Sequence, residues 1–277
     1  MSRPLILCAD DYALTPSVSR AILDLAAHKR ISALSCMTSS PHWPEHGQWL
    51  EDVRDKADIG LHITLVDEAP LTRMPRTAPD GRLPNIATLI RKSYLGLLDL
   101  TEVEGEIRAQ VKAFEGVAGF APQHLDGHLH THVLPGIRNL VLTLARELPS
   151  KPWLRNITDR LPVIAIRGTA VLKAAFLSTL GKAFVREAGD LKDRMNDGFS
   201  GIYGFSPEDT DYGALFERFV ALGGRRPLIM CHPGEAKDSA AHATLRGGEY
   251  EYLKSAACAA LLDRQNYRIA RFAETLP

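Results

Sequence analysis

The sequence predicts an α/β fold, an irregular TIM-like (β/α) barrel that forms a single catalytic domain over 1–277. Short apolar runs alternate along the chain with segments in which apolar residues recur every three or four positions. This alternation is typical of parallel strands joined by crossover helices. Acids and histidines follow several of the apolar runs, and active sites of parallel barrels lie where the strands end. A doubly wound open sheet would show the same alternation and is the alternative.

Eight apolar runs are the strand candidates, and they cover 4–9, 31–38, 58–65, 122–128, 152–157, 199–204, 226–231 and 267–272. Thr15 can cap a first helix with Pro16 at its first position. The pattern from Thr101 to Glu104 resembles a capping box and would open another helix. Three more helices are expected, over 136–147, between 206 and 224, and over 249–263. Two segments, 73–84 and 187–201, resist regular structure and would be either binding lids or solvated connections.

Composition narrows the functional classes. The chain has 277 residues, 45% of them hydrophobic, and its 33 basic residues balance its 33 acidic ones. Net charge therefore gives no reason to expect binding to nucleic acid or to an anionic membrane. The first apolar run is too short for a signal peptide and no run is long enough for a membrane span, so we expect a cytoplasmic protein. The scattered cysteines are expected to be reduced core thiols: Cys8, Cys36, Cys231 and Cys258.

Two neighbouring acids, Asp10 and Asp11, follow the first strand candidate. Like charges this close repel each other, and a bound cation is a common remedy. Adjacent side chains of an ideal strand point to opposite faces, so both acids reach one site only where the strand loosens into a turn. One acid would then bind a metal ion while the other takes a proton. The simpler alternative is that one acid caps the next helix, although Thr15 is better placed for that.

Two single histidines lie on other strand candidates. A lone histidine among apolar neighbours, such as His62, is usually a core residue, but the other candidates favour a metal ligand here. His232 follows the seventh apolar run and precedes a Pro-Gly turn. It is a candidate general acid because imidazole titrates near neutrality, and a turn histidine is the alternative. Cys231 should face away from His232, so a Cys–His nucleophilic pair is not expected.

A cluster of imidazoles and one carboxylate falls on the fourth strand candidate and the turn after it. His124, Asp126 and His128 alternate and would share one face, and His130 and His132 follow. Five such groups in nine residues are too many for a satisfied core, so at least one is expected to bind a metal. Asp126 could fix the tautomer of a ligating imidazole. The pattern leaves open which of the four histidines bind, and a surface cluster without function is the alternative.

These motifs together resemble those of the YdjC-like carbohydrate deacetylases, the ChbG/HpnK family, in the same order over nearly the whole chain. The matching segments are Ala9-Asp10-Asp11-Tyr12, Gly60-Leu-His-Ile-Thr-Leu65, His124-Leu-Asp-Gly-His128, Cys231-His-Pro233 and Arg246-x-x-Glu249-x-x-x-Leu253. Tyr12 and Ala13 stand where the family usually has Phe-Gly. The resemblance implies a distorted TIM-like barrel that uses one divalent metal ion to remove an N-acetyl group from amino sugars.

The resemblance also implies roles for individual residues. The metal ligands would be Asp11, His62 and His128. Asp10 would be the general base, His232 the general acid, and Arg246 a residue that orients or tunes Asp10. The ion would be Mg²⁺ or Zn²⁺, since the donor set favours Zn²⁺ and the family is often described with Mg²⁺.

We therefore expect a metal-dependent hydrolase of N-acetylated amino sugars or oligosaccharides, free or lipid-linked. A hydrolase of another amide or an ester would use the same residues, whereas a non-catalytic sugar-binding module would not need an acid and a base beside a metal. The sequence lacks the motifs of nucleotide-binding loops and of serine hydrolases. Four aromatic residues are candidates for stacking on sugar rings: Trp43, Trp153, Phe199 and Tyr203.

Overall fold

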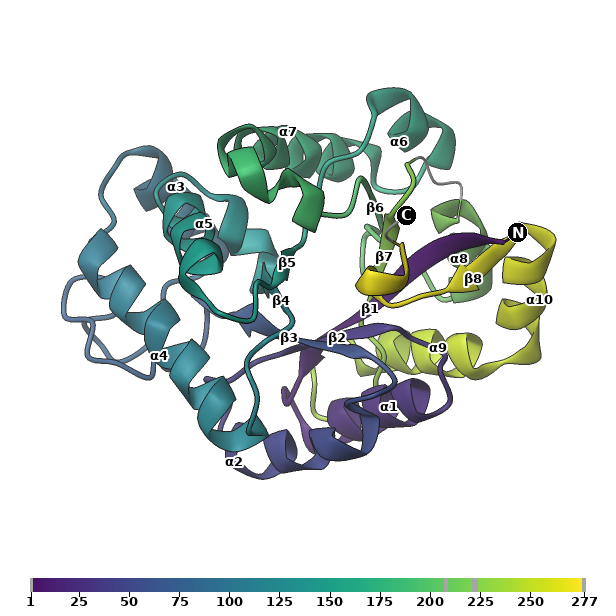
Figure 1. Ribbon diagram of the computed structural model, residues 1–277, viewed down its shortest axis with the longest axis horizontal. Coiled ribbons are helices and arrows are strands. Elements are labelled where there is room, and N and C mark those ends of the chain that lie inside the picture. The colour runs from purple at the N-terminus through teal and green to yellow at the C-terminus, as the bar shows by residue number, and fades with distance from the viewer. Residues whose placement is uncertain (1, 207–208, 221–223, 276–277) are drawn as a thin grey trace.

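The computed structural model describes residues 2–206, 209–220 and 224–275, and its core is one parallel sheet (Figure 1). The strands are β1 (Arg3–Tyr12), β2 (Ala33–Cys36), β3 (Asp58–Ile63), β4 (His124–Gly127), β5 (Trp153–Leu154), β6 (Gly198–Ser200), β7 (Pro227–Cys231) and β8 (Tyr267–Ile269). Their order across the sheet is β5-β4-β3-β2-β1-β7-β6, and β8 pairs with β1 outside this path. All eight strand candidates are confirmed, although several of the observed strands are shorter.

The sheet curls into an irregular barrel with helices around its outer side (Figure 1), which confirms the predicted fold class over the doubly wound alternative. The edge strands β5 and β6 approach each other at a seam. Leu154 forms a parallel bridge with Met195, just before β6. Beyond it, the Asn156 backbone N–H donates to Asn196 Oδ1 at 2.8 Å, and Asn196 Nδ2 donates to the Asn156 carbonyl at 2.7 Å. Side-chain amides thus replace a regular strand ladder at this seam.

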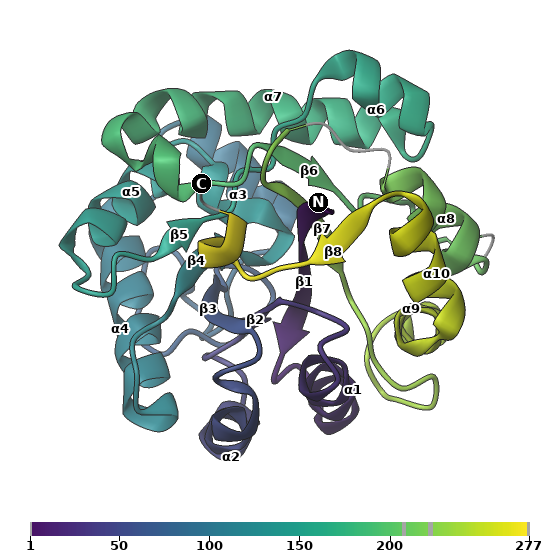
Figure 2. The same ribbon diagram turned by 45° about the vertical axis from the view of Figure 1, so that its right-hand side comes forward.

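Strand β1 explains why the barrel is irregular. Its first residues pair with β8 through Arg3 to Leu5, and the next ones pair with β7 from Ile6 to Ala9. In a regular eight-stranded barrel β8 would separate β7 from β1 along its whole length. Here β8 has only three residues, so β1 leaves it and continues beside β7 (Figure 2).

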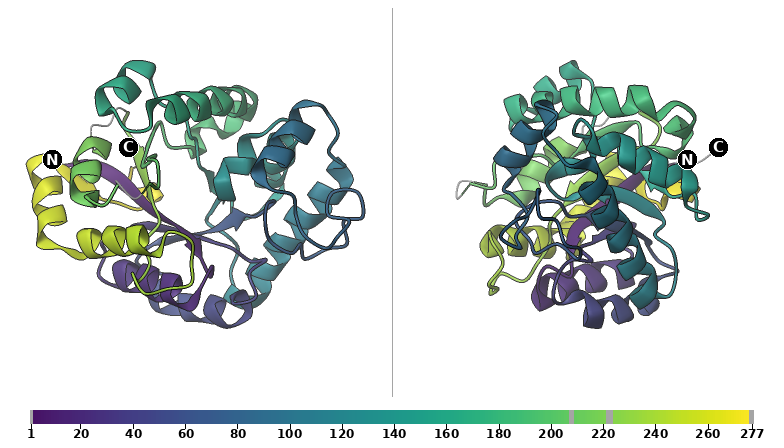
Figure 3. Two further views of the ribbon diagram at one scale, coloured as in Figure 1. Left: turned by 180° about the vertical axis from the view of Figure 1, so that it is seen from behind. Right: turned by 90° about the vertical axis from the view of Figure 1, so that its left-hand side faces the viewer.

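The helices are α1 (Pro16–Ala27), α2 (Trp43–His46), α3 (Ile86–Tyr94), α4 (Leu100–Ala118), α5 (Ile137–Glu147), α6 (Leu161–Arg167), α7 (Val171–Ala188), α8 (Tyr212–Phe219), α9 (Ala243–Lys254) and α10 (Ala256–Arg264). Short 3-10 helices cover Gly47–Val53, His128–Val133, Gly189–Arg194 and Phe272–Thr275. Helices α1 and α9 lie side by side (Figure 3). This arrangement brings residues near both ends of the chain to the same side of the barrel.

Some of the predicted helix boundaries are correct and others are wrong. Thr15 caps α1 as expected, since its hydroxyl accepts from the Val18 N–H at 3.3 Å. The capping box at Thr101 is wrong, because α4 begins earlier and Asp99 caps it. The helix expected over 249–263 is two helices, because Ser255 takes an extended conformation that ends α9 and caps α10.

The helix expected between 206 and 224 is shorter than predicted. It begins at Tyr212, where the Asp211 side chain accepts from the Ala214 N–H, and it ends at Phe219. Positions 207–208 and 221–223 lie outside the described residues. Asp211 therefore does the capping that was expected near Ser206.

The two segments expected to be irregular differ. Segment 73–84 contains no helix or strand, as predicted. Segment 187–201 is largely regular, because α7 runs to Ala188, a 3-10 helix follows and β6 begins at Gly198. The local sequence there is polar, but the seam at Met195 and Asn196 imposes order on it. All four cysteines are buried and unpaired, as expected. Among the described helices, none is long and apolar enough to cross a membrane.

Candidate functional site

A strained turn at the end of β1 brings two carboxylates to one site. The register between β1 and β2 shifts between Ala9 and Tyr12, and Asp11 has a φ of 68°. The irregularity breaks the strict alternation of side chains, as the sequence required. Ala13 has a φ of 74°, a conformation that glycine adopts more easily and that costs an alanine roughly 1–2 kcal/mol. The turn at Ala13 therefore keeps a glycine-like conformation, at the position where the family that the sequence resembles usually has glycine.

Asp11, His62 and His128 form a buried cluster of metal-ligand type. Asp11 Oδ1 lies 2.9 Å from His128 Nδ1 and 3.5 Å from His62 Nε2. One potential ligand atom from each residue lies within 4.8 Å of the others. One carboxylate and two imidazoles form a donor set that suits a divalent ion. The structure thus brings together the three ligands that the resemblance implies.

Arg246 from α9 contacts the other oxygen of Asp11. Its Nη2 donates to Asp11 Oδ2 at 2.5 Å. Burial opposes ionisation, but Arg246 and His128 outweigh it and hold the pKa of Asp11 well below its usual range. Asp11 is therefore charged. Arg246 was expected to orient or tune Asp10, but its hydrogen bond goes to Asp11 instead, from a helix that packs beside α1.

Asp126 orients the imidazole of His62. His62 Nδ1 donates to Asp126 Oδ1 at 2.6 Å, which leaves Nε2 facing Asp11. Ser35 Oγ donates to Asp126 Oδ2, also at 2.6 Å. Burial alone would lower the pKa of His62, but Asp126 and Asp10 outweigh burial and raise it to about 10. The position suggested for Asp126 by the sequence, behind a ligating imidazole, agrees with this geometry.

A buried arginine holds Asp10. Arg155 follows β5 and is fully buried, and its two terminal nitrogens donate to the two oxygens of Asp10 at 2.6 Å each. Arg155 also pairs with Asp126 at 2.5 Å. Asp10 Oδ2 lies 4.0 Å from His62 Nε2. One guanidinium therefore links the proposed base to the carboxylate that orients His62, a role that sequence reasoning did not assign to any residue.

His232 lies where β7 ends and is partly exposed. Its backbone N–H donates to Glu249 Oε2 at 2.6 Å, which fixes the turn that carries the imidazole. Although the residue is partly exposed, its Nδ1 is buried, and that burial lowers the pKa of His232 to about 4 while the neighbouring Asp11 and Asp10 oppose the shift. The imidazole is therefore mainly neutral at neutral pH before any substrate binds.

The other histidines of the cluster have separate positions. His124 is buried, stacks on Trp153 and hydrogen-bonds Ser35 through Nε2 at 2.9 Å. A Cβ at Gly60 would lie 2.3 Å from the His124 ring, so only glycine fits there. His132 Nε2 lies 3.0 Å from the Arg155 carbonyl. These contacts separate His124 and His132 from the Asp11 cluster.

His130 also lies apart from that cluster. Its ring packs edge-on against Phe199 with centroids 5.5 Å apart. Both Leu129 and His130 have positive φ, at 50° and 60°, so the chain turns sharply after His128. Of the four histidines that the sequence left open, His128 is the one placed against Asp11.

Three contributors to the site had no assigned role in the sequence. Ser35 lies within β2 and Arg155 directly follows β5, and a polar residue in or just after an apolar strand was the available signal. Glu249 appeared only as part of a matching motif, and it lies one helical turn from Arg246 on α9. One helix thus reaches both Asp11 and the backbone of His232.

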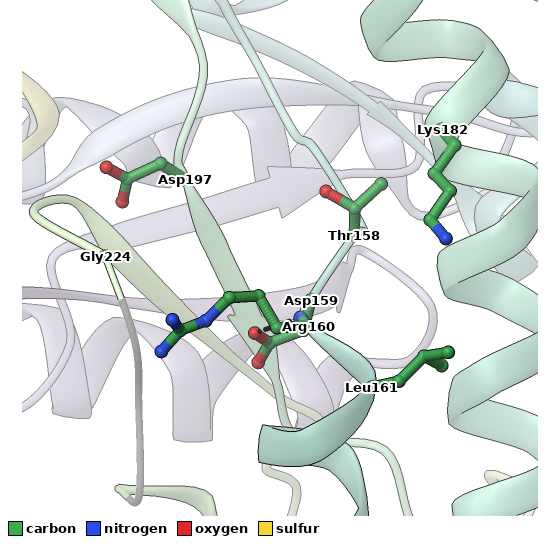
Figure 4. A pocket seen from close by; sticks show the side chains of 7 residues that line it. All are labelled: Thr158, Asp159, Arg160, Leu161, Lys182, Asp197 and Gly224. Carbon is green, nitrogen blue, oxygen red and sulfur yellow. Dashed lines mark hydrogen bonds between the residues drawn. The ribbon is translucent and has the colours of Figure 1, made fainter.

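A separate surface cavity of about 580 Å³ lies near the seam (Figure 4). Its lining residues are Thr158, Asp159, Arg160, Leu161, Lys182, Asp197 and Gly224. None of the candidate catalytic or metal-binding residues is among them. Its two acids already have partners, because Asp159 pairs with Arg167 and Asp197 accepts from the backbone N–H groups of 225 and 226. This cavity therefore has no part in the chemistry of the site.

Comparison with known proteins identifies the family. The family described as YdjC-like protein matches residues 4–264. The chitooligosaccharide deacetylase of Klebsiella pneumoniae (strain 342) is 25% identical over 98% of this chain and 99% of its own. The protein of that name from Yersinia pestis (strain Pestoides F) is 29% identical over 84% and 82%. A crystal structure from Enterococcus faecalis V583, of a protein named for cellobiose-phosphate cleavage, shares the fold, with a TM-score of 0.74 and 22% identity over both full chains. The resemblance seen in the sequence is confirmed, and the chain belongs to the YdjC-like protein family.

Proposed function

We propose that this protein is a metal-dependent carbohydrate N-deacetylase that hydrolyses the acetamido group of an amino sugar to acetate and a free amine. The observation that carries the proposal is the cluster of Asp11, His62 and His128 beside a second carboxylate, Asp10. Membership of the YdjC-like family and relatives named chitooligosaccharide deacetylase support the substrate class. The substrate would be an N-acetylated amino sugar or a short oligosaccharide, free or lipid-linked.

Asp11, His62 and His128 would hold one divalent ion. Their two imidazoles and one carboxylate favour Zn²⁺, and Mg²⁺ is the alternative. When bound, such an ion lowers the pKa of water and polarises an amide carbonyl. The hydrogen bond from His62 Nδ1 to Asp126 leaves Nε2 available as the ligand atom.

Asp10 acts as the general base in this mechanism. It takes a proton from water as the water oxygen bonds to the acetyl carbon. Arg155 holds both carboxylate oxygens in place, and each oxygen retains a lone pair that can accept the proton. The 4.0 Å distance from Asp10 Oδ2 to His62 Nε2 supports a base next to the proposed ligands.

His232 acts as the general acid. It gives a proton to the amide nitrogen as the carbon–nitrogen bond breaks, and without that proton the nitrogen is a poor leaving group. Because burial lowers the pKa of His232 to about 4, its proton must arrive during turnover. The proton released by the attacking water balances the one gained by the amine.

An acetate-release screen tests the proposal. N-acetylglucosamine, its β-1,4-linked oligomers, an acetylated peptide and an acetate ester are each incubated with the protein, with and without a chelator. We expect acetate from the N-acetylated sugars, loss of release with the chelator, and recovery when Zn²⁺ or Mg²⁺ is added back. Release from the ester or the peptide alone would favour the other hydrolase classes, and metal-independent release would contradict the proposed chemistry.

A further inference from the structure

The aromatic residues that the sequence offered for sugar stacking are all core residues. Trp43, Trp153, Phe199 and Tyr203 are exposed by only 2%, 4%, 1% and 2%. A sugar ring needs an aromatic face that reaches solvent, so none of these four can provide one. Another aromatic residue, beside His232, is less buried than these four.

Phe205 follows β6 and is half-buried. The ring stacks on Tyr203, with centroids 4.1 Å apart and planes 18° from parallel. Its ring centroid lies 5.0 Å from that of His232 and 5.4 Å from that of His242, both in T-shaped arrangements. His242 is exposed and precedes α9. An aromatic ring flanked by two imidazoles therefore adjoins the proposed general acid.

The backbone at Phe205 is strained, with a φ of 54°. Such a conformation in a bulky residue costs of order 1–3 kcal/mol and persists only where surrounding contacts enforce it. Upstream, Gly201 has a φ of 100°, and a Cβ there would lie 2.1 Å from the Met230 carbonyl oxygen. The segment after β6 is thus pressed against β7, which leads to His232.

One buried carboxylate ties this aromatic segment to the general acid. The Tyr203 hydroxyl donates to Glu249 Oε1 at 2.5 Å, and the His232 N–H donates to Glu249 Oε2 at 2.6 Å. Glu249 is fully buried on α9. Tyr203 stacks on the Phe205 ring, and Glu249 binds both Tyr203 and the backbone of His232. These contacts set the spacing between Phe205 and His232 before any substrate binds.

We propose that Phe205, with His232 and His242 beside it, forms a binding platform for a pyranose ring of the substrate. This inference rests on the proposed function and adds a site that binds sugar to the site that cleaves the amide. A pyranose ring presents an apolar face of C–H groups and a rim of hydroxyls. The aromatic ring takes the apolar face and the imidazoles take the hydroxyls. Because His232 must reach the amide nitrogen, the platform holds the reacting sugar or its immediate neighbour.

Steady-state kinetics of Phe205→Ala, Phe205→Leu and Phe205→Trp test the platform, with metal-loaded protein and N-acetylglucosamine oligomers as substrates. We expect KM to rise by about tenfold in Phe205→Ala, a loss of about 1.4 kcal/mol in binding, with kcat within about twofold. Phe205→Leu keeps apolar volume without an aromatic face and should also raise KM. Phe205→Trp should keep KM near the wild-type value. Tyr94→Ala, which removes an exposed aromatic ring from α3, is the control and should change neither constant.

Isothermal titration of N-acetylglucosamine trimer into each variant separates this inference from the proposed function. If the wild type releases acetate and both Phe205→Ala and Phe205→Leu keep the wild-type KM, the platform is wrong while the function stands. If the wild type binds the trimer without releasing acetate and Phe205→Ala does not bind it, the function is wrong and the platform stands. If the wild type neither binds nor hydrolyses the trimer, both are overturned. A Phe205→Ala protein that fails to fold leaves Phe205→Leu and Phe205→Trp to decide.

Discussion

Two buried arginines make the adjacency of Asp10 and Asp11 tolerable. Arg155 binds both oxygens of Asp10, and Arg246 binds one oxygen of Asp11. Each acid has its own guanidinium from a different part of the chain. The oxygen of Asp11 that Arg246 does not contact, Oδ1, faces the histidines. The different partners explain how neighbouring acids can take different roles, one as base and one as ligand. The two arginines therefore balance the negative charges of both acids even without a metal ion.

His62→Ala should lose the bound metal. The change removes one of three ligands and leaves Asp126 without the imidazole that it orients. Elemental analysis of the purified variant, after incubation with Zn²⁺ and removal of excess ion, measures the loss. His28→Ala, at an exposed histidine beyond the end of α1, is the control and should keep the wild-type stoichiometry. Full metal occupancy in His62→Ala would remove His62 from the ligand set.

Glu249 should make folding stability depend on pH. Burial raises its pKa from 4.5 to about 7, although Tyr203 and the His232 N–H oppose the shift. A raised carboxyl pKa means that the folded state binds a proton that the unfolded state releases, so this stability is complete below pH 4.5 and lost as pH rises through 7. Relative to Glu249→Gln, the wild type should lose about 3 kcal/mol of unfolding free energy over that range. Urea unfolding at several pH values measures the difference, and parallel curves for the two proteins would refute it.

For single residues, a position directly after a predicted strand was the signal that pointed to the site. Asp10, Asp11 and His232 could be found because each directly follows an apolar run, and His128 because it alternates with His124. Arg155 lies inside the predicted strand 152–157, but arginine there has no chemistry of its own, and its partners are far away in the sequence. The partner of Arg246 was wrong for the same reason, since α9 could not be placed relative to the acids without the fold.

At the scale of elements, α4 holds the long loop that follows β3. Three of its side chains, Glu102, Glu106 and Gln110, lie one turn apart and accept backbone N–H groups of the loop. Glu106 is fully buried and accepts from the N–H groups of Leu71 and Thr72. These hydrogen bonds attach the loop to α4 at several points along its length.

Glu106→Ala should release this loop. It removes the acceptors for two backbone N–H groups and one hydroxyl, and unpaired buried groups cost about 1–3 kcal/mol each. Hydrogen exchange should accelerate at Leu71 and Thr72 while the β1 amides stay protected. Glu104→Ala, at a half-exposed acid two residues away, should leave exchange unchanged. Unchanged protection at Leu71 and Thr72 in Glu106→Ala would show that the loop is held by other contacts.

Strands could be predicted better than helix ends. The buried strands are short apolar runs bounded by polar residues, and their positions follow from hydrophobicity alone. Helix boundaries depended on which polar residue caps first, so Asp99 displaced the expected cap at Thr101. Segment 187–201 became ordered through the contact of Met195 with Leu154, which no local pattern signals.

At the scale of the whole molecule, the barrel closes through side chains. The seam between β5 and β6 depends on Asn156 and Asn196, which exchange three hydrogen bonds at 2.7 to 3.1 Å. Arg155 directly precedes this seam, so closure and the position of the proposed base are linked. The fold class could be predicted from the alternation of strands and helices, but this closure could not, because two asparagines 40 residues apart carry no periodic signal.

Asn196→Ala should open the seam. It removes three side-chain hydrogen bonds to buried backbone groups, including one to the Gly198 carbonyl, and should lower the unfolding free energy by about 2–4 kcal/mol. Guanidinium unfolding measures this loss. Asn139→Ala, at an exposed position of α5, should change stability by less than about 0.5 kcal/mol. Equal stabilities for the two variants would show that the seam contributes little.

The central claim is that Asp10 acts as the base beside a metal held by Asp11, and Asp10→Asn tests it most directly. Metal content and acetate release from N-acetylglucosamine oligomers are measured on the same preparation of this variant and of the wild type. We predict wild-type metal content with acetate release lowered by about 10²- to 10⁴-fold, because the amide cannot take the proton. Normal acetate release from the metal-loaded variant would contradict the account.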